Sequence, residues 1–358
     1  MTKKILILPG DGIGQEVTAS SIEILNYLID RYSLGFNIQT MDVGGKAYDL
    51  HGSPIPNDVL NEAKKSDAIL FGAVGGPKWD GLGWDVRPEQ ALLTLRKELG
   101  LFANLRPAFL FDELASASPI KNKIIEGLDI LIVRELTGGI YFGEPRAIVT
   151  DETPNYAFNT MVYNEDEIRR IAKIGFESAQ KRKGKLCSVE KANVLEVSKF
   201  WREIVTDMAK DYPDVELSHQ LADNTAMQLV LNPNQYDVIV SSNLFGDILS
   251  DIAATLSGSI GMLPSASLNS SLQGMYEPCH GSAPDIAGMN IANPIAMIAS
   301  LAMALRYSLN QEGLADILEN SIKIFIEKGH RTKDISTTED YIKTSEVATS
   351  LIEIMNNE

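Results

Sequence analysis

Two aspartates lie four residues apart in the apolar segment 243–251, which reads NLFGDILSD. If this segment is helical, Asp247 and Asp251 stack on one face, where their like charges repel by roughly 0.2–0.5 kcal/mol. A divalent cation would relieve that repulsion, and Mg²⁺ and Mn²⁺ prefer oxygen ligands of this kind. For an aspartate pair alone, a solvated helix face is the more ordinary interpretation. Residues elsewhere in the chain therefore decide whether a metal site is the better one.

A third carboxylate could join this pair. Asp223 begins the segment 223–230, DNTAMQLV, whose composition predicts the start of a helix. An aspartate at that position is an ordinary N-cap. Together with Asp247 and Asp251 it becomes a candidate third metal ligand.

Three arginines occupy settings unusual for a surface cation. Arg96 and Arg106 flank the segment 97–105, and Arg134 follows the apolar run 130–133, which predicts a buried strand. Converging guanidinium groups would bind a dicarboxylate, because each can donate two parallel hydrogen bonds to a carboxylate. Any one of the three alone is more ordinarily part of a structural ion pair.

A tyrosine and a lysine are candidate proton carriers. Tyr141 lies between the glycine pair 138–139 and Gly143, which would let the backbone approach a ligand and leave the phenol free to donate a proton. Lys191 follows residues 186–189, a predicted strand, with Asn193 nearby. A lysine held near a metal and arginines loses its proton more readily, which suits a general base. Taken singly, packing and solvent exposure remain the ordinary interpretations of these two side chains.

Two loops could bind a nucleotide. The loop at residues 9–14, PGDGIG, follows a predicted strand and opens a predicted helix, so it could cradle phosphate or be a tight turn. Its third glycine comes one residue too early for the G-x-G-x-x-G dinucleotide fingerprint. The segment 276–294 is rich in small residues and carries His280 and Asp285, which suits adenosine: the aspartate would accept from ribose hydroxyls and repel a 2′-phosphate.

Composition limits the possible partners. The chain has 358 residues, of which 44% are hydrophobic, and a net charge of −16. This acidic balance disfavours nucleic acid and anionic membranes, and it requires a local basic cluster for any anionic substrate. The length favours two domains.

No targeting segment is predicted. The apolar run 5–8 ends at Pro9, too soon for a signal peptide, and the apolar stretch 291–305 is too short for a membrane span. The two cysteines, Cys187 and Cys279, imply no disulfide framework, so a cytoplasmic location is expected.

Apolar runs and amphipathic segments alternate along the chain, which predicts an α/β architecture with a mostly parallel sheet. The predicted strands lie at 5–8, 68–71, 130–133, 186–189 and 238–240. The predicted helices lie near 16–30, 89–98, 165–182, 195–210, 244–256, 295–308 and 313–327. Residues 156–163 predict an antiparallel arm, and the Gly- and Ser-rich stretch 257–271 predicts a crossing or functional loop.

Nine sequence blocks, in order, resemble the isocitrate/isopropylmalate dehydrogenase family of β-hydroxyacid oxidative decarboxylases, over about residues 5–308. The blocks are PGDGIG, GGPKWD, LRKELGLFANLRP, RELTGGIYFG, EKANVLE, DNTAMQL, NLFGDILSD, GSIGMLPSASL and EPCHGSAPDIAG with IANP. The resemblance implies a two-domain α/β fold distinct from the Rossmann fold. It implies a cofactor-binding domain of residues 1–101 plus 258–358 and a central domain of residues 102–257, which carries substrate and metal residues and the homodimer interface.

The resemblance also implies roles for individual residues. Tyr141 and Lys191 would be the catalytic acid and base, and Mg²⁺ or Mn²⁺ would be held by Asp223, Asp247 and Asp251. Lys191 and Asp223 would reach the site of the neighbouring subunit. The implied substrate-binding residues are Arg96, Arg106, Arg134, Asp223, Glu89, Leu92, Leu93 and Val194. The implied NAD-binding residues are Ile13, His280, Gly281, Ser282, Ala283, Asp285, Ile286 and Asn293.

Two segments of the sequence indicate which cofactor and which substrate the resemblance implies. Asp285-Ile286 resembles the NAD-type pair. Leu92 and Leu93 would contact the isopropyl group of 3-isopropylmalate, whereas the extra carboxylate of isocitrate would lose its hydration beside these leucines. Three departures from the family pattern are Gln15, Glu190 and the pair Met289-Asn290.

Two rival functions stay open at this point. D-malate or tartrate oxidation would use the same clamp, metal and cofactor loop. A silent regulatory subunit would be expected to lack one of the catalytic or metal residues, all of which are present here.

Overall fold

The computed structural model describes residues 2–151 and 153–357, and the chain divides into two units. Unit 1 consists of Met1–Leu101, Leu110–Pro119 and Ser257–Glu358, and unit 2 of Phe102–Phe109 and Ile120–Leu256. The sequence placed residues 110–119 in the central domain, whereas the structure includes them in unit 1. No described helix is both long and apolar enough to cross a membrane.

In unit 1, the strands follow the order β2-β1-β3-β12-β11, of which β11 alone runs antiparallel to its neighbour β12. The strands are β1 (Lys3–Gly10), β2 (Phe36–Thr40), β3 (Ala68–Ala73), β11 (Pro264–Leu268) and β12 (Gly274–Pro278). The helices are α1 (Gly14–Tyr32), α2 (Gly44–His51), α3 (Asn57–Ala63), α4 (Glu89–Glu98), α10 (Ile295–Tyr307), α11 (Glu312–Glu327) and α12 (Thr344–Asn356).

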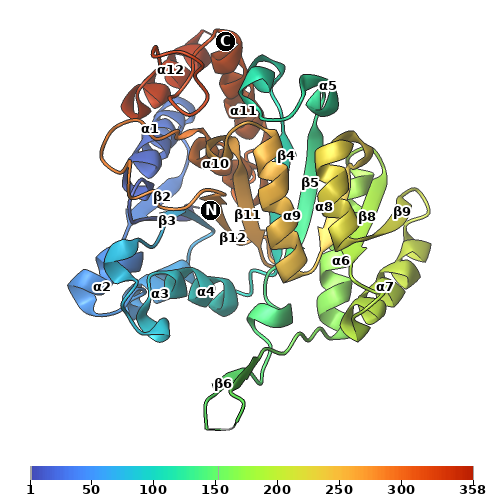
Figure 1. Ribbon diagram of the computed structural model, residues 1–358. Coiled ribbons are helices and arrows are strands. Elements are labelled where there is room, and N and C mark those ends of the chain that lie inside the picture. Colours follow the sequence, from blue (N-terminus) through green and yellow to red (C-terminus); the bar gives the residue numbers. More distant parts are fainter. Residues whose placement is uncertain (1, 152, 358) are drawn as a thin grey trace. The chain divides into compact units, whose positions relative to one another are not determined.

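Helices cover both faces of the unit 1 sheet (Figure 1). Leu6, Leu8 and Phe71 pack with residues of α3 and α4 in one apolar cluster. On the opposite face, α10 packs against β12 and β11, and α1 against α10 and α12. Because both faces are buried, the strands read as continuous apolar runs, which is why the sequence revealed β1 and β3.

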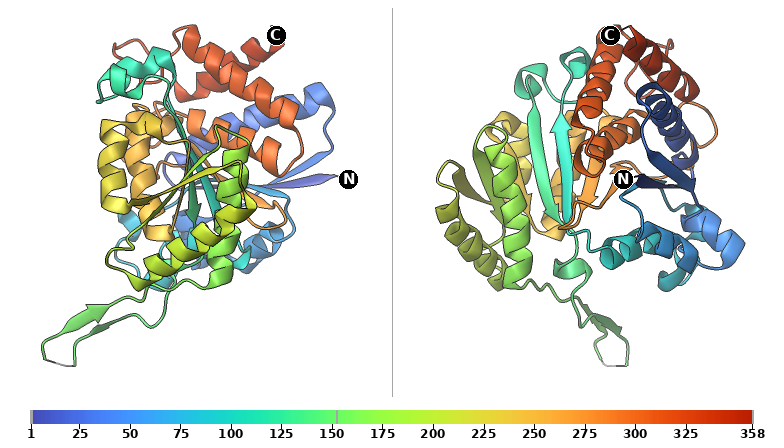
Figure 2. Two further views of the ribbon diagram at one scale, coloured as in Figure 1. Left: turned by 90° about the vertical axis from the view of Figure 1, so that its right-hand side faces the viewer. Right: turned by 180° about the vertical axis from the view of Figure 1, so that it is seen from behind.

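In unit 2, the strands follow the order β4-β5-β10-β8-β9, and all are parallel to their neighbours except β4. The strands are β4 (Ala103–Phe109), β5 (Asp129–Glu135), β8 (Lys185–Glu190), β9 (Glu216–Leu221) and β10 (Val238–Ser241). The helices are α5 (Asn122–Ile125), α6 (Glu165–Gln180), α7 (Glu196–Met208), α8 (Ala222–Leu231) and α9 (Asn243–Leu256). Helices α6 and α7 pack together, as do α8 and α9 (Figure 2).

An antiparallel ribbon extends away from the sheet of unit 2 (Figure 1). It pairs β6 (Ala147–Val149) with β7 (Tyr156–Phe158), in the region where the sequence predicted an antiparallel arm. Ile148, in the middle of β6, is 80% exposed. An isolated two-stranded ribbon is marginally stable at best in water.

Two interpretations of local structure from the sequence differ from the observed elements. The N-cap alternative for Asp223 does not hold, because α8 begins at Ala222 and Leu221 caps it without a side-chain hydrogen bond. Residues 264–268, in the predicted loop 257–271, and residues 276–278, in the predicted nucleotide loop, belong instead to the buried strands β11 and β12. Small residues predict a loop only where no other element packs on them. Here helix α10 packs on both strands.

Candidate active site

Helix α9 presents its two aspartates to two arginines within unit 2. Arg134 pairs with Asp247, and Nη1 of Arg106 lies 3.7 Å from Asp247 and 3.4 Å from Asp251. The two carboxylates therefore share one face of the helix, as their spacing predicted. Burial raises the pKa of Asp251, against the lowering effect of Arg106, and the charge of Asp247 adds to the increase.

The guanidinium of Arg134 is buried because α9 packs directly on it. Arg134 is 2% exposed near the end of β5, and a Cβ on Gly246 would lie 2.9 Å from its side chain. Glycine at position 246 thus allows the close approach of helix and arginine. In β4, Arg106 reaches the same helix through a 2.8 Å hydrogen bond to Oγ of Ser250.

Tyr141 points to the same carboxylate. Its hydroxyl donates to Oδ2 of Asp247 at 2.8 Å, and burial together with that hydrogen bond raises the pKa of the phenol. The tyrosine ends a short 3₁₀ turn in which Gly139 has φ +74°, and the ring of Tyr163 fills the space where a Cβ on Gly139 would lie. The phenol is therefore held in its protonated form, as an acid requires.

Lys191 and Asp223 form a separate pair in unit 2. Nζ of Lys191 donates to Oδ1 of Asp223 at 2.6 Å, and this hydrogen bond lowers the pKa of the carboxyl. Asp223 does not join Asp247 and Asp251 within one chain, since no group of three or more potential metal-binding side chains occurs among residues 2–151 and 153–357. Within unit 2, one chain brings together Arg106, Arg134, Tyr141 and the two carboxylates of α9, and it holds the Lys191–Asp223 pair apart.

In unit 1, Arg96 already has a carboxylate partner. Its Nη2 donates to Oε1 of Glu277 at 2.8 Å, and both side chains are 9% exposed. Nε of Arg96 is buried without a hydrogen-bond partner among the described residues. Sequence analysis missed Glu277, because the two residues are 181 positions apart and adjacent only in the fold.

The residues predicted to contact the isopropyl group have unequal surroundings. Leu92 packs against the unit 1 core, whereas Leu93 is half-buried outside that cluster. Val194, in unit 2, is 65% exposed. Glu89 is exposed at the start of α4, with its carboxylate beside Gly75.

The glycine-rich loop 9–14 is a tight turn whose amides hydrogen-bond within the chain, rather than an open phosphate-binding loop. Its amides are used internally: Asp11 N donates to Ala73 O at 2.7 Å and Ile13 N to Ser282 O at 2.8 Å. Gly10 and Gly12 have φ of +72° and +55°. The sequence left open a phosphate-binding loop and a tight turn, and the hydrogen bonds fit the turn. The amide of Ile13 binds the segment at Ser282 and is not available to a phosphate.

The segment 280–286 has polar groups available for a ligand. Nε2 of His280 is buried without a hydrogen-bond partner among the described residues, and burial lowers the pKa of this imidazole. Asp285 is exposed, and the described part of the chain supplies no partner for it. Gly281 is also exposed, Ala283 and Ile286 are partly buried, and Ser282 is buried. These features fit an adenosine, which would supply partners for both polar groups.

Asn293 serves the protein itself. Its Oδ1 accepts from Ile295 N at 3.0 Å at the start of α10, and its Nδ2 donates to Asp334 at 3.0 Å. Asp334 also accepts from Ser259 and Thr332, so it ties three segments together near the predicted nucleotide loop. No motif of the sequence singled out Asp334.

For a metal, the donor set fits. Asp247 and Asp251 supply carboxylate oxygens, the ligand type that Mg²⁺ and Mn²⁺ prefer, and a cation there would relieve the like charge on α9. Two carboxylates leave most coordination positions to other ligands. A complete site therefore requires donors from beyond this cluster.

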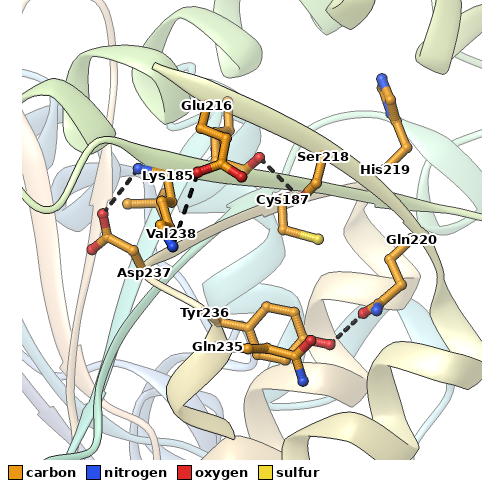
Figure 3. A pocket seen from close by; sticks show the side chains of 11 residues that line it. Lys185, Cys187, Glu216, Ser218, His219, Gln220, Gln235, Tyr236, Asp237 and Val238 are labelled. Atoms are coloured by element: carbon orange, nitrogen blue, oxygen red, sulfur yellow. Dashed lines mark hydrogen bonds and ion pairs between the residues drawn. The ribbon is translucent and has the colours of Figure 1, made fainter. Parts of the chain in front are cut away.

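A cavity of about 200 Å³ in unit 2 is separate from these residues (Figure 3). It lies along β8, β9 and β10, and its lining includes Cys187, Gln220 and Tyr236. The Tyr236 hydroxyl donates to Gln220, as Figure 3 shows. None of the residues predicted to bind substrate, cofactor or metal lines it.

Comparison with solved structures gives the class of protein: the fold is that of the decarboxylating α/β dehydrogenases. The chain matches an isocitrate dehydrogenase from Methylococcus capsulatus with a TM-score of 0.88 and 30% identity, covering 99% of each chain. It matches a β-decarboxylating dehydrogenase from Thermococcus kodakarensis with a TM-score of 0.81 and 35% identity, covering 99% and 97%.

Sequence comparison narrows the class to a family. The isocitrate/isopropylmalate dehydrogenase model matches residues 4–351. A 3-isopropylmalate dehydrogenase of Pseudomonas savastanoi pv. phaseolicola is 55% identical over 100% of both chains, and one of Pseudomonas putida is 58% identical over 94% of this chain and 93% of its own. The chain belongs to the isocitrate/isopropylmalate dehydrogenase family. This confirms the resemblance and the fold class predicted from sequence.

Proposed function

We propose that the protein catalyses the NAD-dependent oxidative decarboxylation of (2R,3S)-3-isopropylmalate to 4-methyl-2-oxopentanoate and CO₂, a step in leucine biosynthesis. The observation that carries this proposal is that Asp247 contacts both Arg134 and Tyr141, the residues proposed as carboxylate receptor and proton donor. The named relatives, 55–58% identical, support the substrate. A biosynthetic role and two free cysteines are consistent with the cytoplasm.

Arg106 and Arg134 would bind the carboxylates of the substrate and fix its orientation, since both guanidinium groups face the Asp247–Asp251 pair. Arg96, which pairs with Glu277, would also bind a substrate carboxylate. A Mg²⁺ or Mn²⁺ ion held by Asp247, Asp251 and Asp223 would polarise the C2 oxygen, and NAD⁺ would accept the hydride.

Two side chains would then move protons. Lys191 would remove the proton of the C2 hydroxyl, directly or through a water. The oxidised product is a β-keto acid, which loses CO₂, and Tyr141 would return a proton to the carbon. Its raised pKa keeps the proton on the phenol until that step.

A homodimer would complete the site. The described faces of α8 and α9 expose apolar side chains, including Met227 at 56%, Leu231 at 64% and Ile248 at 51%. The ribbon of β6 and β7 likewise exposes Ile148. A second copy of the chain would cover these surfaces and would bring its Lys191 and Asp223 to the aspartates of α9.

The test is NADH formation with Mn²⁺, comparing 3-isopropylmalate, D-malate and isocitrate, each with NAD⁺ and with NADP⁺. A strong preference for 3-isopropylmalate and NAD⁺ is expected. Faster turnover of D-malate would move the protein to a sister activity. Silence with all three substrates would refute the proposed enzyme and favour a regulatory role.

A further inference from the structure

Two arginines of unit 2 are held by buried asparagines. Nε of Arg106 donates to Oδ1 of Asn104 at 2.7 Å, and Nε and Nη2 of Arg134 donate to Oδ1 of Asn243 at 3.1 and 2.8 Å. Asn104 and Asn243 are 0% and 1% exposed. Each amide is therefore a fixed part of the interior, and the arginine that it holds is oriented by it.

Two other arginines of unit 2 have a carboxylate, instead of an amide, as the partner of Nε. Nε of Arg182 donates to Asp237 at 2.8 Å, and Nε of Arg202 donates to Glu190 at 2.7 Å. The side chains of these carboxylates are 1% and 2% exposed. The donor atom and the distances are similar, but the acceptor is negatively charged. A carboxylate cancels the charge of the guanidinium, whereas an amide oxygen orients it and leaves its charge in place.

We propose that Asn104 and Asn243 are positioning residues, whose neutral amides fix the guanidinium groups of Arg106 and Arg134 at the Nε end without adding a further negative charge beside the aspartates of α9. This inference rests on the proposed function of the two arginines as carboxylate receptors. Arg96 differs from them because its charged partner Glu277 is buried, whereas the charged partners of Arg106 and Arg134 on α9 are partly exposed.

The location of the asparagines supports this role. Asn104 lies directly opposite Arg134 in the antiparallel pairing of β4 and β5. Asn243 is the first residue of α9, and its Nδ2 donates to Leu136 O at 3.1 Å and Gly138 O at 3.3 Å, in the segment that leads to Tyr141. One amide thus orients an arginine with its oxygen and the tyrosine loop with its nitrogen, which a carboxylate cannot do because it has no donor.

The aspartates of α9 contact the opposite end of each guanidinium. Arg134 meets Asp247 through Nη1, and Arg106 lies near Asp247 and Asp251 through Nη1. Their side chains are 31% and 63% exposed, unlike the two asparagines. The Nε end is thus anchored in the interior by a neutral group, and the Nη1 end faces the predicted substrate and cation.

The experiment exchanges the amides for carboxylates of the same size, in Asn104→Asp and Asn243→Asp. Both variants keep the acceptor oxygen, and an aspartate at the start of α9 is favourable for the helix. We expect KM for 3-isopropylmalate, and its Kd with Mn²⁺ in the absence of NAD⁺, to rise at least about tenfold. KM for NAD⁺ should stay close to the wild-type value, whereas the melting temperature of Asn243→Asp should fall, because Leu136 O and Gly138 O lose their donor.

The matched control makes the reverse exchange at a structural pair, in Asp237→Asn. It removes the charged partner of Arg182, so a lower melting temperature with an unchanged KM for 3-isopropylmalate is expected. The inference is overturned if both asparagine variants bind substrate as the wild type does, or if Asp237→Asn weakens binding as much as they do. If Asn243→Asp does not fold, Asn104→Asp decides by the same criteria.

The wild-type protein separates this inference from the proposed function. If it oxidises D-malate rather than 3-isopropylmalate, the proposed substrate is wrong, and the same comparison is made with the Kd of D-malate. A tenfold weaker binding of D-malate in the asparagine variants would then still support the positioning role. A wild-type protein that binds none of the tested dicarboxylates would overturn both.

Discussion

The hydroxyl of Tyr141 donates a 2.8 Å hydrogen bond to Asp247, and the same carboxylate pairs with Arg134. Asp247, itself a predicted metal ligand, therefore contacts both a predicted proton donor and a predicted substrate receptor. Substitutions at these positions should separate binding from the chemical steps, because a different role is proposed for each residue.

Replacing Tyr141 with Phe should slow decarboxylation more than hydride transfer. The ring and its packing remain, but the proton for the product carbon is lost, at a cost of roughly 100-fold or more in that step. Rapid-mixing measurements would show NADH formed ahead of CO₂ and release of the 2-oxo acid that still carries both carboxylates. Loss of substrate affinity without such an intermediate would contradict the role of Tyr141 as the acid.

Replacing Asp247 with Asn should raise the Mn²⁺ concentration required for half-maximal activity by at least about tenfold, because an amide supplies one neutral oxygen in place of a charged carboxylate. A metal titration measured by activity and by direct binding would check this. Asp166→Asn, on an exposed turn of α6, is the control and should leave the titration unchanged. An unchanged titration for Asp247→Asn would refute its assignment as a ligand.

Mixing two inactive variants should restore activity if subunits share their sites. In a hybrid dimer of Lys191→Ala with Tyr141→Phe, one of the two sites has both residues intact, so random pairing should recover roughly a quarter of wild-type activity. Steady-state rates after co-refolding or co-expression would measure this.

The control for the mixing experiment pairs Lys191→Ala with Asp223→Ala. Lys191 and Asp223 lie together in one chain, so every shared site of that hybrid lacks one of them. We expect no recovery. If the first mixture also stays inactive, the site is not shared in the proposed way.

Shortening Leu93 should affect the branched substrate selectively. Leu93→Ala removes apolar contact from the predicted isopropyl pocket, and kcat/KM for 3-isopropylmalate should fall roughly tenfold relative to that for D-malate. Leu92→Ala should instead lower stability by about 1–2 kcal/mol, since Leu92 packs on the unit 1 core. An equal loss for both substrates in Leu93→Ala would mean that Leu93 does not contact the isopropyl group.

Protonation of His219 should destabilise the protein at acidic pH. Burial, aided by Arg202, lowers the pKa of His219 from 6.5 to about 4. Its Nδ1 lies 3.7 Å from Glu190, but Arg202 already pairs with that carboxylate, so the lowered pKa is the expected result. Nε2 contacts the Thr206 hydroxyl at 2.9 Å.

The sign follows from proton binding: between pH 6.5 and about 4 the unfolded state binds this proton and the folded state does not. Stability is therefore complete above pH 6.5 and falls as pH decreases through that window, by at most about 3 kcal/mol. Denaturant unfolding of wild type and His219→Gln at several pH values would measure this, and the variant should lose less stability. Parallel curves for the two proteins would contradict the prediction.

The fold class was predictable because the central strands are apolar on both faces. The runs at 5–8 and 130–133 lie in β1 and β5, and their side chains are buried. Strands of mixed composition, such as β9, and those rich in small residues, such as β11, gave no such signal. Their conformation depends on the elements that cover and pair with them, so local sequence was insufficient.

The contacts at Asp247 could be anticipated only in part. Helical spacing alone places Asp247 and Asp251 on one face, and Arg134 was recognisable at the end of an apolar run. The roles proposed for these residues remain predictions. The asparagines that hold the arginines were not foreseen, because a buried Asn in a strand or at a helix start resembles many structural ones.

The sequence by itself determined the α/β class, the family and the set of residue types able to bind an acid, a cation and a nucleotide, since these depend on local periodicity and on motif order. Only the tertiary structure decided which charges meet. Arg96 meets Glu277, 181 positions further along the chain, whereas Arg134 meets the neutral Asn243 through Nε and Nη2 and Asp247 through Nη1. Such pairings are set by the packing of distant segments, and packing is a property of the whole fold.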